Sequence, residues 1–266
     1  MTSNTPKFEK RRPEPVQKGN PYRLTLNQHF FPRMSIERFY QKGGVEVHLK
    51  MQHRLIRCTS ADPIFCAKRV WDQSSEQGFM LQIESTYQNL AERVLAGQDN
   101  LNEEENAAIT DFYLLWNLRQ RAKSNPPQFP GIPGWRPKVI ISEKNEQERM
   151  EKAGIAYWNQ EGKLPDHVSV GTSLQLEILA ERERMNGTKW GIFTVKARNG
   201  EFLVPDRLSE HTALPLSPRI CFVAGYSNRN VDSSFVRQYN SLAIANAEKF
   251  YFASHIKNCP IFLRAK

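Results

Sequence analysis

The segment that most constrains the fold is Asn102–Lys123, which carries every local signal of a long amphipathic helix. Asn102 can cap the N-terminus, and Glu105 three residues later completes a capping box. Acidic residues open the segment and basic residues close it, as the helix dipole favours. One face is apolar at helical spacing and carries Ala108, Phe112, Leu115 and Trp116. The sequence therefore predicts a long helix here.

A second helix is predicted over Gln77–Ala96, with Gly97 as its C-cap. The short loop 98–101 makes the two helices antiparallel neighbours. Glu84 lies on the apolar face of the first helix, and Arg119 lies on the apolar face of the second. Two interpretations stay open: a buried ion pair that fixes the register of the hairpin, or a cleft in which Arg119 holds a phosphate or carboxylate. Arg121 and Lys123 fall off the apolar stripe and are expected to be solvated.

Shorter elements surround this hairpin. Around Pro32 we expect an extended piece followed by a short helix, and then two short strands at Val45–Leu49 and Leu55–Ile56. Asn199-Gly200 predicts a hairpin between Trp190–Ala197 and Glu201–Val204. Further predicted elements are helices at Asn145–Ala153, Ser173–Met185 and Ser233–Ala247, and strands at Arg219–Gly225 and Lys249–Ala253. The predicted fold is α+β, an N-terminal helical hairpin packed on a mostly antiparallel C-terminal sheet.

The domain organisation follows from composition. Residues 1–23 are polar, basic and proline-bearing, which predicts a disordered tail. A mainly helical half is expected over 24–125, a proline-rich connector over 126–138 and a mixed α/β half over 139–266. The two halves are expected to form one compact domain over 24–266.

Charge and cysteine content limit the functional classes. The net charge is +9, and its excess is concentrated near the two ends of the chain. Such ends favour contact with RNA, DNA or another polyanion, although solubility alone explains them equally well. No apolar run approaches the roughly 18 residues of a membrane span, so no membrane partner is expected. Without a secretory signal or a C-x-x-C pair, a cytoplasmic location and reduced thiols are expected.

Two polar groups offer candidate acid–base chemistry. His29 lies in the motif QHFFP, where its ring either bonds to nearby backbone or acts as a general acid or base. Asp206, Glu210 and His211 follow the predicted hairpin and could bind a divalent metal, exchange protons or simply form a polar loop.

Metal dependence stays open, but a zinc site is disfavoured. The four residues His48, His53, Cys58 and Cys66 match no closed zinc spacing. Two Pro-Asp pairs resemble the start of a metal-dependent nuclease motif, but neither is followed by a well-placed acid-x-Lys. The chain also contains no phosphate-binding P-loop and no dinucleotide-binding glycine pattern.

Aromatic and basic residues alternate between Tyr226 and Tyr239. Rings could stack on bases, and arginines could hold phosphates. Helix packing explains Phe235 and Tyr239 more simply, which leaves Arg229 and Arg237 as the better nucleic-acid contacts.

Several short motifs occur in a familiar order: QHFFP, IESTYQNL, ITDFYLLWNLR, LPLSPR and QYNSLAIANAEKFYFAS. Over roughly residues 27–255 the chain resembles domain-of-unknown-function family 4238 of bacteria and phages. Such families are often associated with phage defence and mobile elements. A Thr-Ser-Asp-Asn-Pro-like turn of that family is replaced here by Leu203–Arg207, in which only Asp206 matches. The resemblance therefore transfers no activity.

Two functional hypotheses follow. The first is a nucleic-acid-directed effector, with a nuclease as one form, whose cleft is lined by His29, Arg119, Asp206 and His211. The second is a non-enzymatic regulatory module that binds protein or nucleic acid. The expected binding residues are Arg33, Glu84, Arg229 and Arg237. Convergence of His29, Arg119 and the 206–211 loop would favour the catalytic form.

Overall fold

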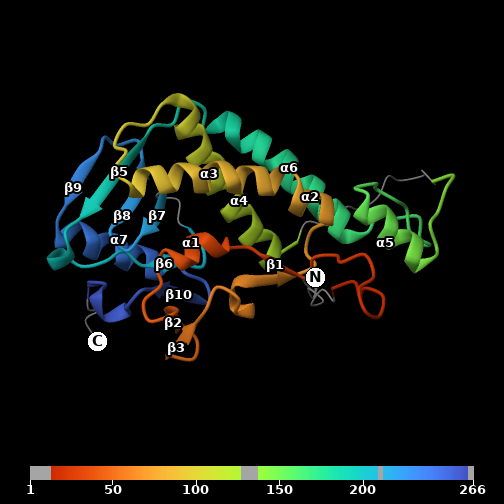
Figure 1. Cartoon of the computed structure of the whole chain (residues 1–266), viewed down its shortest axis with the longest axis horizontal. Helices are drawn as coiled ribbons and strands as arrows, with labels where there is room; N and C mark the ends of the chain where they lie inside the picture. Colours follow the sequence, from red (N-terminus) through yellow and green to blue (C-terminus); the bar gives the residue numbers. More distant parts are fainter. Residues whose placement is uncertain (1–12, 127–136, 209–211, 263–266) are drawn as a thin grey trace, which may run out of the picture.

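The computed structural model describes residues 13–126, 137–208 and 212–262. Long helices lie along one side of the molecule, and two four-stranded sheets lie against them (Figure 1). The helices are α1 (Arg33–Glu37), α2 (Gln73–Gln77), α3 (Phe79–Leu95), α4 (Glu103–Ser124), α5 (Lys144–Lys152), α6 (Asp166–Arg184) and α7 (Ser233–Asn246). The strands are β1 (Asn27–His29), β2 (Val45–Leu49), β3 (Arg54–Cys58), β4 (Cys66–Lys68), β5 (Trp190–Val195), β6 (Val204–Pro205), β7 (Ala213–Ser217), β8 (Ile220–Ala224), β9 (Arg229–Val231) and β10 (Phe250–Ala253).

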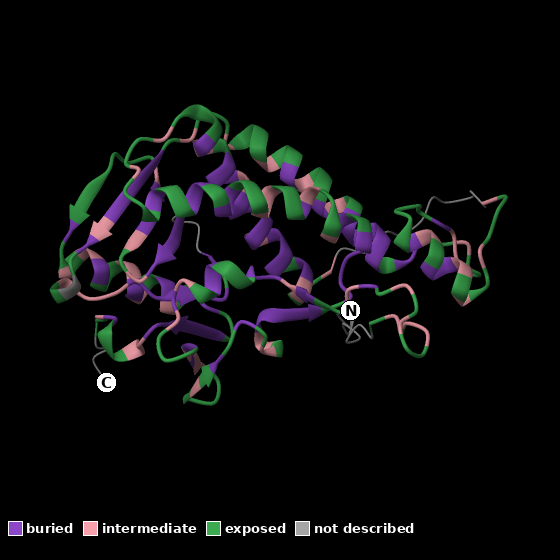
Figure 2. Cartoon of the chain, viewed as in Figure 1, coloured by how far each residue is buried: buried purple, intermediate pink, exposed green. Residues whose placement is uncertain are grey.

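Helix α4 lies at the centre of the molecule and begins with the predicted capping box. The Asn102 side chain accepts from the Glu105 amide at 2.8 Å, and the Glu105 carboxylate accepts from the Asn102 amide at 2.9 Å. The helix packs on both α3 and α6, and the Tyr87 and Phe112 rings stack with their centroids 3.7 Å apart. Most of α4 is therefore buried (Figure 2).

The predicted placement of the helices relative to the sheet is wrong. The hairpin of α3 and α4 occupies the middle of the chain, and strands that precede it pair with strands that follow it. One sheet has the order β3-β2-β10-β6, in which Val47 pairs with Phe252. The second sheet has the order β7-β8-β5-β9. Pairing between segments about 200 residues apart leaves no local pattern, which is why the sequence did not indicate it.

The predicted hairpin at Asn199-Gly200 is also wrong. Strand β5 pairs antiparallel with β8 and parallel with β9, whereas β6 belongs to the other sheet. Asn199 ends a short 3-10 turn. After it, the Glu201 amide donates to the Asn258 carbonyl and the Phe202 amide donates to the Pro218 carbonyl. These long-range hydrogen bonds replace the pairing that the local turn signal favoured.

The N-terminal segment 14–22 contacts α5. This segment lies within the range that was predicted to be disordered. The Gln17 amide donates to the Glu148 carboxylate at 2.7 Å, and the Tyr22 hydroxyl donates to Asn145 at 2.9 Å. Helix α5 and this segment form a projection at one end of the molecule (Figure 1). Most of the proline-rich connector, residues 127–136, lies outside the described residues. Within the described ranges, no helix is long and apolar enough to cross a membrane.

Candidate nucleic-acid interface

Arg119 lies on the buried face of α4 and is surrounded by fixed partners. Its guanidinium forms an ion pair with Glu84 of α3 and lies 3.6 Å from a carboxylate oxygen of Glu76 of α2. It also lies 5.2 Å from the centre of the Trp71 ring. The side chain is only 1% exposed. Two carboxylates and an aromatic ring thus compensate the buried charge, which leaves no open side from which a phosphate could approach.

His29 and Arg119 do meet, but through the histidine backbone. The guanidinium donates to the His29 carbonyl at 3.2 Å. The ring Nε2 of His29 lies instead 2.9 Å from the Ser60 carbonyl. This is the backbone-bonded arrangement, one of the two interpretations open for this histidine.

Asp206 is held by backbone amides. Its carboxylate accepts from the amides of Glu248, Lys249 and Phe250 at 2.7, 2.8 and 3.3 Å. The pKa of Asp206 is raised above its usual value, because the effect of burial exceeds the opposite effect of these three hydrogen bonds. The carboxylate therefore fixes the turn that leads into β10. Glu210 and His211, the other residues of this predicted site, lie outside the described residues.

The structure places Lys123 differently from the sequence prediction. Its Nζ atom lies 3.7 Å from the centre of the Phe30 ring and donates to the Ile64 carbonyl at 3.2 Å. Burial, together with the charge of Lys249, lowers the pKa of Lys123 to about 8. The residue was expected to be solvated, yet it follows Arg119 by four positions and so shares its helix face. Arg121 is solvated as expected and pairs with Glu177.

The remaining candidates are Arg33 and the residues considered for a metal site. Arg33 is exposed and lies 3.7 Å from Glu37 on the same helix. Within the described ranges, no three His, Cys, Asp or Glu side chains are placed to hold a metal ion. His48 stacks on Tyr251 at 4.9 Å, and the four cysteines are buried free thiols.

A different surface, at the β5–β9 edge, combines an exposed aromatic ring with an arginine. Tyr226 is 53% exposed, and the Arg229 guanidinium lies 5.3 Å from its ring centre and 5.1 Å from that of Phe193. Gly191 allows this arrangement, because a Cβ atom there would lie 2.5 Å from the Tyr226 carbonyl oxygen. The Asn228 side chain then accepts from the Ile192 amide at 2.7 Å, which fixes the segment on β5.

No protein-family model, no curated protein and no solved structure matches this chain. The resemblance to domain-of-unknown-function family 4238 thus stays an expectation.

A shallow hollow adjoins the Tyr226 ring. Its volume is about 640 Å³, and its lining includes Lys189, Arg184 and Ser227. Arg184 lies 2.7 Å from Glu181, whereas Lys189 is exposed and has no ion pair among the described residues. The hollow therefore offers positive charge beside a ring that can stack.

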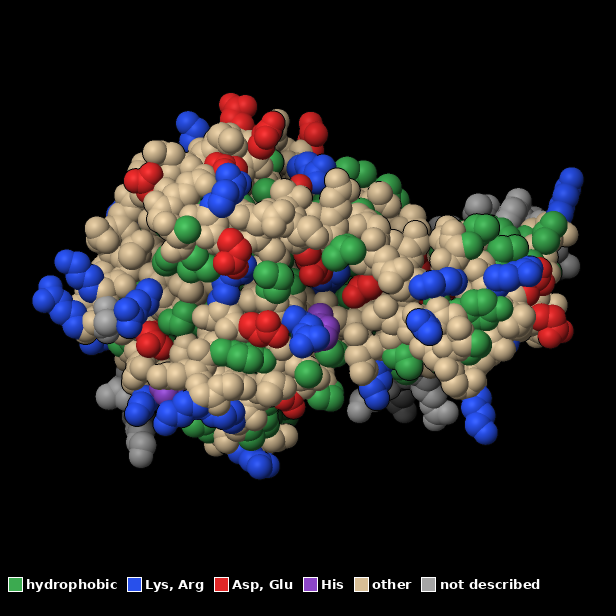
Figure 3. Space-filling model, viewed as in Figure 1, with side chains coloured by type: hydrophobic (Ala, Val, Ile, Leu, Met, Phe, Trp, Pro, Cys, Tyr) green, Lys and Arg blue, Asp and Glu red, His purple; other side chains and the backbone are tan. Residues whose placement is uncertain are grey.

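The C-terminal part of the described chain is basic. Between residues 190 and 262, the described part of the chain holds eight Lys or Arg residues and four Asp or Glu residues. Four of these basic residues, exposed and without ion pairs to described residues, are Lys196, Arg198, Arg219 and Arg237. Arg237 lies 5.9 Å from the ring of Phe262, which is 55% exposed. Lys and Arg side chains gather at this end of the molecule (Figure 3). Arg229 and Arg237, both predicted binding residues, each lie beside an exposed ring.

Proposed function

We propose that this protein is a non-enzymatic module that binds single-stranded nucleic acid at the β5–β9 edge. The observation that carries the proposal is the exposed Tyr226 ring, with the Arg229 guanidinium beside it and a basic hollow next to both. Proteins that bind single strands combine aromatic rings on which bases stack with a positive surface that follows the phosphates. A base on Tyr226 would place its phosphates near Arg229 and Lys189.

The catalytic hypothesis has less support from the same geometry. A catalytic group must reach its substrate by hydrogen bonding. Arg119 is enclosed by two glutamates and Trp71, and the Asp206 carboxylate holds three backbone amides. Both groups are committed to the fold, so we do not assign them a role in a nuclease.

The setting of the module is part of the proposal. A regulatory role in phage defence, in the cytoplasm, agrees with the resemblance and with four buried cysteines that remain free thiols. Recognition would depend little on sequence, because every base has a face that can stack.

The proposal predicts that Tyr226→Ala weakens binding of a single-stranded oligonucleotide about tenfold. One stacked base contributes roughly 1–3 kcal/mol. Arg229→Ala should weaken binding uniformly across sequences and lower the slope of log affinity against log salt by about 1. Fluorescence anisotropy with labelled DNA and RNA strands of about 16 nucleotides measures both effects, and gel analysis of the same samples reports whether the strands stay intact.

Matched variants separate stacking from general charge effects. Tyr226→Phe keeps the ring and should bind like wild type. Arg149→Ala removes one positive charge from α5, at the opposite end of the molecule, and should leave the affinity nearly unchanged. The proposal fails if wild type binds no single strand, or if Tyr226→Phe weakens binding as much as Tyr226→Ala. Cleavage of the strands by the purified wild-type protein would support the nuclease hypothesis over the binding module.

A further inference from the structure

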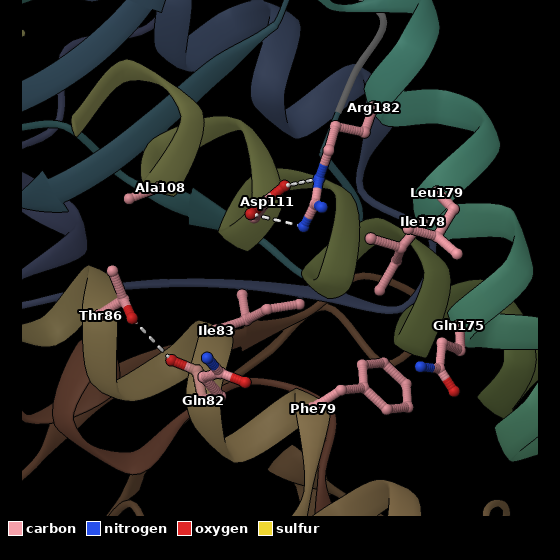
Figure 4. Close-up of a pocket in the computed structure, with 10 residues that line it drawn as sticks. All are labelled: Phe79, Gln82, Ile83, Thr86, Ala108, Asp111, Gln175, Ile178, Leu179 and Arg182. Carbon is pink, nitrogen blue, oxygen red and sulfur yellow. Dashed lines mark hydrogen bonds and ion pairs between the residues drawn. The ribbon is translucent and has the colours of Figure 1, made fainter. Parts of the chain in front are cut away.

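A second surface, between the long helices, has a different chemistry. A groove of about 300 Å³ runs between α3 and α6, with α4 as its floor. Figure 4 shows side chains of α3 and α6 facing each other across the groove, with Asp111 of α4 and Arg182 of α6 joined by hydrogen bonds of 2.7 and 2.8 Å. This pair holds α6 on α4 and so fixes the width of the groove.

The groove is lined at helical spacing on both sides. Helix α3 contributes positions 79, 82, 83 and 86, and α6 contributes positions 175, 178, 179 and 182. In each helix these positions follow the i, i+3, i+4, i+7 pattern of a packing face. Phe79, Ile83 and Leu179 supply apolar contacts, and Leu179 is 52% exposed. The two stripes thus form the kind of groove into which a further helix can pack.

The charge of this layer is opposite to that of the whole chain. Helices α3, α4 and α6 together hold ten acidic and six basic residues, which gives a net charge of −4 against +9 for the chain. Within the described ranges, Glu103, Glu104 and Glu183 have no ion pair. Helices α4 and α6 run antiparallel, because Arg121 pairs with Glu177 and Asp111 pairs with Arg182. These three glutamates therefore lie at the same end of the groove.

We propose that the groove between α3 and α6 is the docking site for a basic amphipathic helix of a partner protein. The apolar face of that helix packs on Phe79, Ile83 and Leu179, and its Lys or Arg residues face Glu103, Glu104 and Glu183. The groove has no free strand edge to pair with an extended peptide, since three helices form it. The net negative charge of these three helices disfavours a nucleic acid in the groove. The groove shares helix α6 with the hollow beside Tyr226, but the residues that line the two sites differ.

The test uses a synthetic helical peptide of Leu and Lys, about 18 residues long, with a fluorescent label. A second peptide, in which Glu replaces Lys, tests the role of charge. A third peptide has the same residues as the first in scrambled order and tests the role of the amphipathic pattern. Wild-type protein should bind the first peptide with a Kd in the range of about 10 µM and bind the other two at least about tenfold more weakly.

Two variants of the same helix locate the binding. Leu179→Arg places a charge inside the groove and should weaken binding of the first peptide at least about tenfold, since an apolar anchor is lost and charge repulsion added. Leu176→Arg adds the same charge on α6 at a residue that is 62% exposed and outside the groove, and should change the affinity less than about twofold. Thermal melting confirms that both variants fold.

Other occupants of the groove give distinct results, each of which overturns the proposal. Equal affinity for the ordered and scrambled peptides would show that binding is non-specific electrostatic attraction and needs no amphipathic helix. An equal loss of peptide affinity in Leu179→Arg and Leu176→Arg would show that the peptide binds outside the groove. A wild-type dimer in sedimentation that Leu179→Arg converts to a monomer, without peptide binding, would assign the groove to a second copy of the chain.

Discussion

At the residue scale, Arg119 shows how a buried charge is tolerated in this fold. The guanidinium is enclosed by Glu84, Glu76 and Trp71, and it donates to the His29 carbonyl. Such an arrangement costs desolvation energy, so removal of one partner leaves the other charges unpaired. Arg119 is thus a structural tie between α2, α3, α4 and β1.

We therefore expect Arg119→Ala to lower the free energy of unfolding by about 3–5 kcal/mol, the range for one broken partner of a buried pair. Urea denaturation followed by circular dichroism measures this loss. Arg121→Ala, two residues away with a side chain that is 60% exposed, should change stability by less than about 0.5 kcal/mol. Equal stability of the two variants would show that Arg119 does not tie the helices together.

The pair of Glu84 and Arg119 could be predicted from the sequence because both residues lie on apolar helix faces of one hairpin. The structural role of the pair could not be predicted, because the Arg119 guanidinium is also enclosed by Trp71 and Glu76. These two residues belong to α2 and the segment before it, outside the hairpin. Lys123 was misjudged for a related reason. Its ring partner, Phe30, belongs to the segment after β1, which has no local connection to α4.

At the element scale, the N-terminal segment is tied to α5 and α6 by a cluster of titratable groups. The two ring nitrogens of His167 lie 3.2 Å from carboxylate oxygens of Glu14 and Glu151. Glu151 also pairs with Arg69 at 2.9 Å, and Glu14 with Lys144 at 2.5 Å. The cluster therefore connects segment 14–22 to the body of the protein through charge.

Burial opposes the charged ring, but the two carboxylates raise the pKa of His167 above its usual value. Burial likewise opposes charge on Glu14, but His167 and Lys144 lower its pKa to about 2. The stabilisation from His167 is fully present below about pH 6.5 and is lost as the pH rises through its raised value. The stabilisation from Glu14 is present above about pH 4.5 and is lost as the pH falls toward its lowered value.

We predict that the free energy of unfolding falls as the pH rises above about 6.5, because His167 loses its proton as the pH passes its raised pKa. In His167→Gln this alkaline loss should be much smaller, and the variant should be less stable than wild type at the acidic end. Urea denaturation at several pH values gives the measurement. Parallel pH profiles for wild type and His167→Gln would show that another group is responsible.

At the scale of the whole molecule, the sequence predicted local elements far better than their pairing. The boundaries of α3, α4, α7 and β10 came within a few residues because caps and periodicity are local. The place of β10 between β2 and β6 was missed, since a strand of four residues carries no sign of its neighbours. Tyr226 and Arg229 are only three positions apart in the sequence, so their contact was the part of the candidate site most open to prediction.

The sheet order predicts that the chain cannot fold without its last strand. Truncation after Ala247 removes β10 and leaves β2 and β6 without the strand that joins them. This variant should lose its cooperative thermal transition, as followed by circular dichroism. A chain that ends at Phe262 keeps every described contact and is the control. A cooperative melt of the shorter chain would show that residues 1–247 fold without β10.

The central place of β10 also affects how the protein is made. A ribosome adds roughly 5–20 residues per second, so about 10–40 s separate the synthesis of β2 from that of its partner β10. During that interval Val45 and Val47 belong to a two-stranded ribbon whose edge has no partner, and such ribbons are marginally stable in water. Nascent chains are then open to edge-to-edge association, and the yield of folded protein depends on the chaperones that shield them.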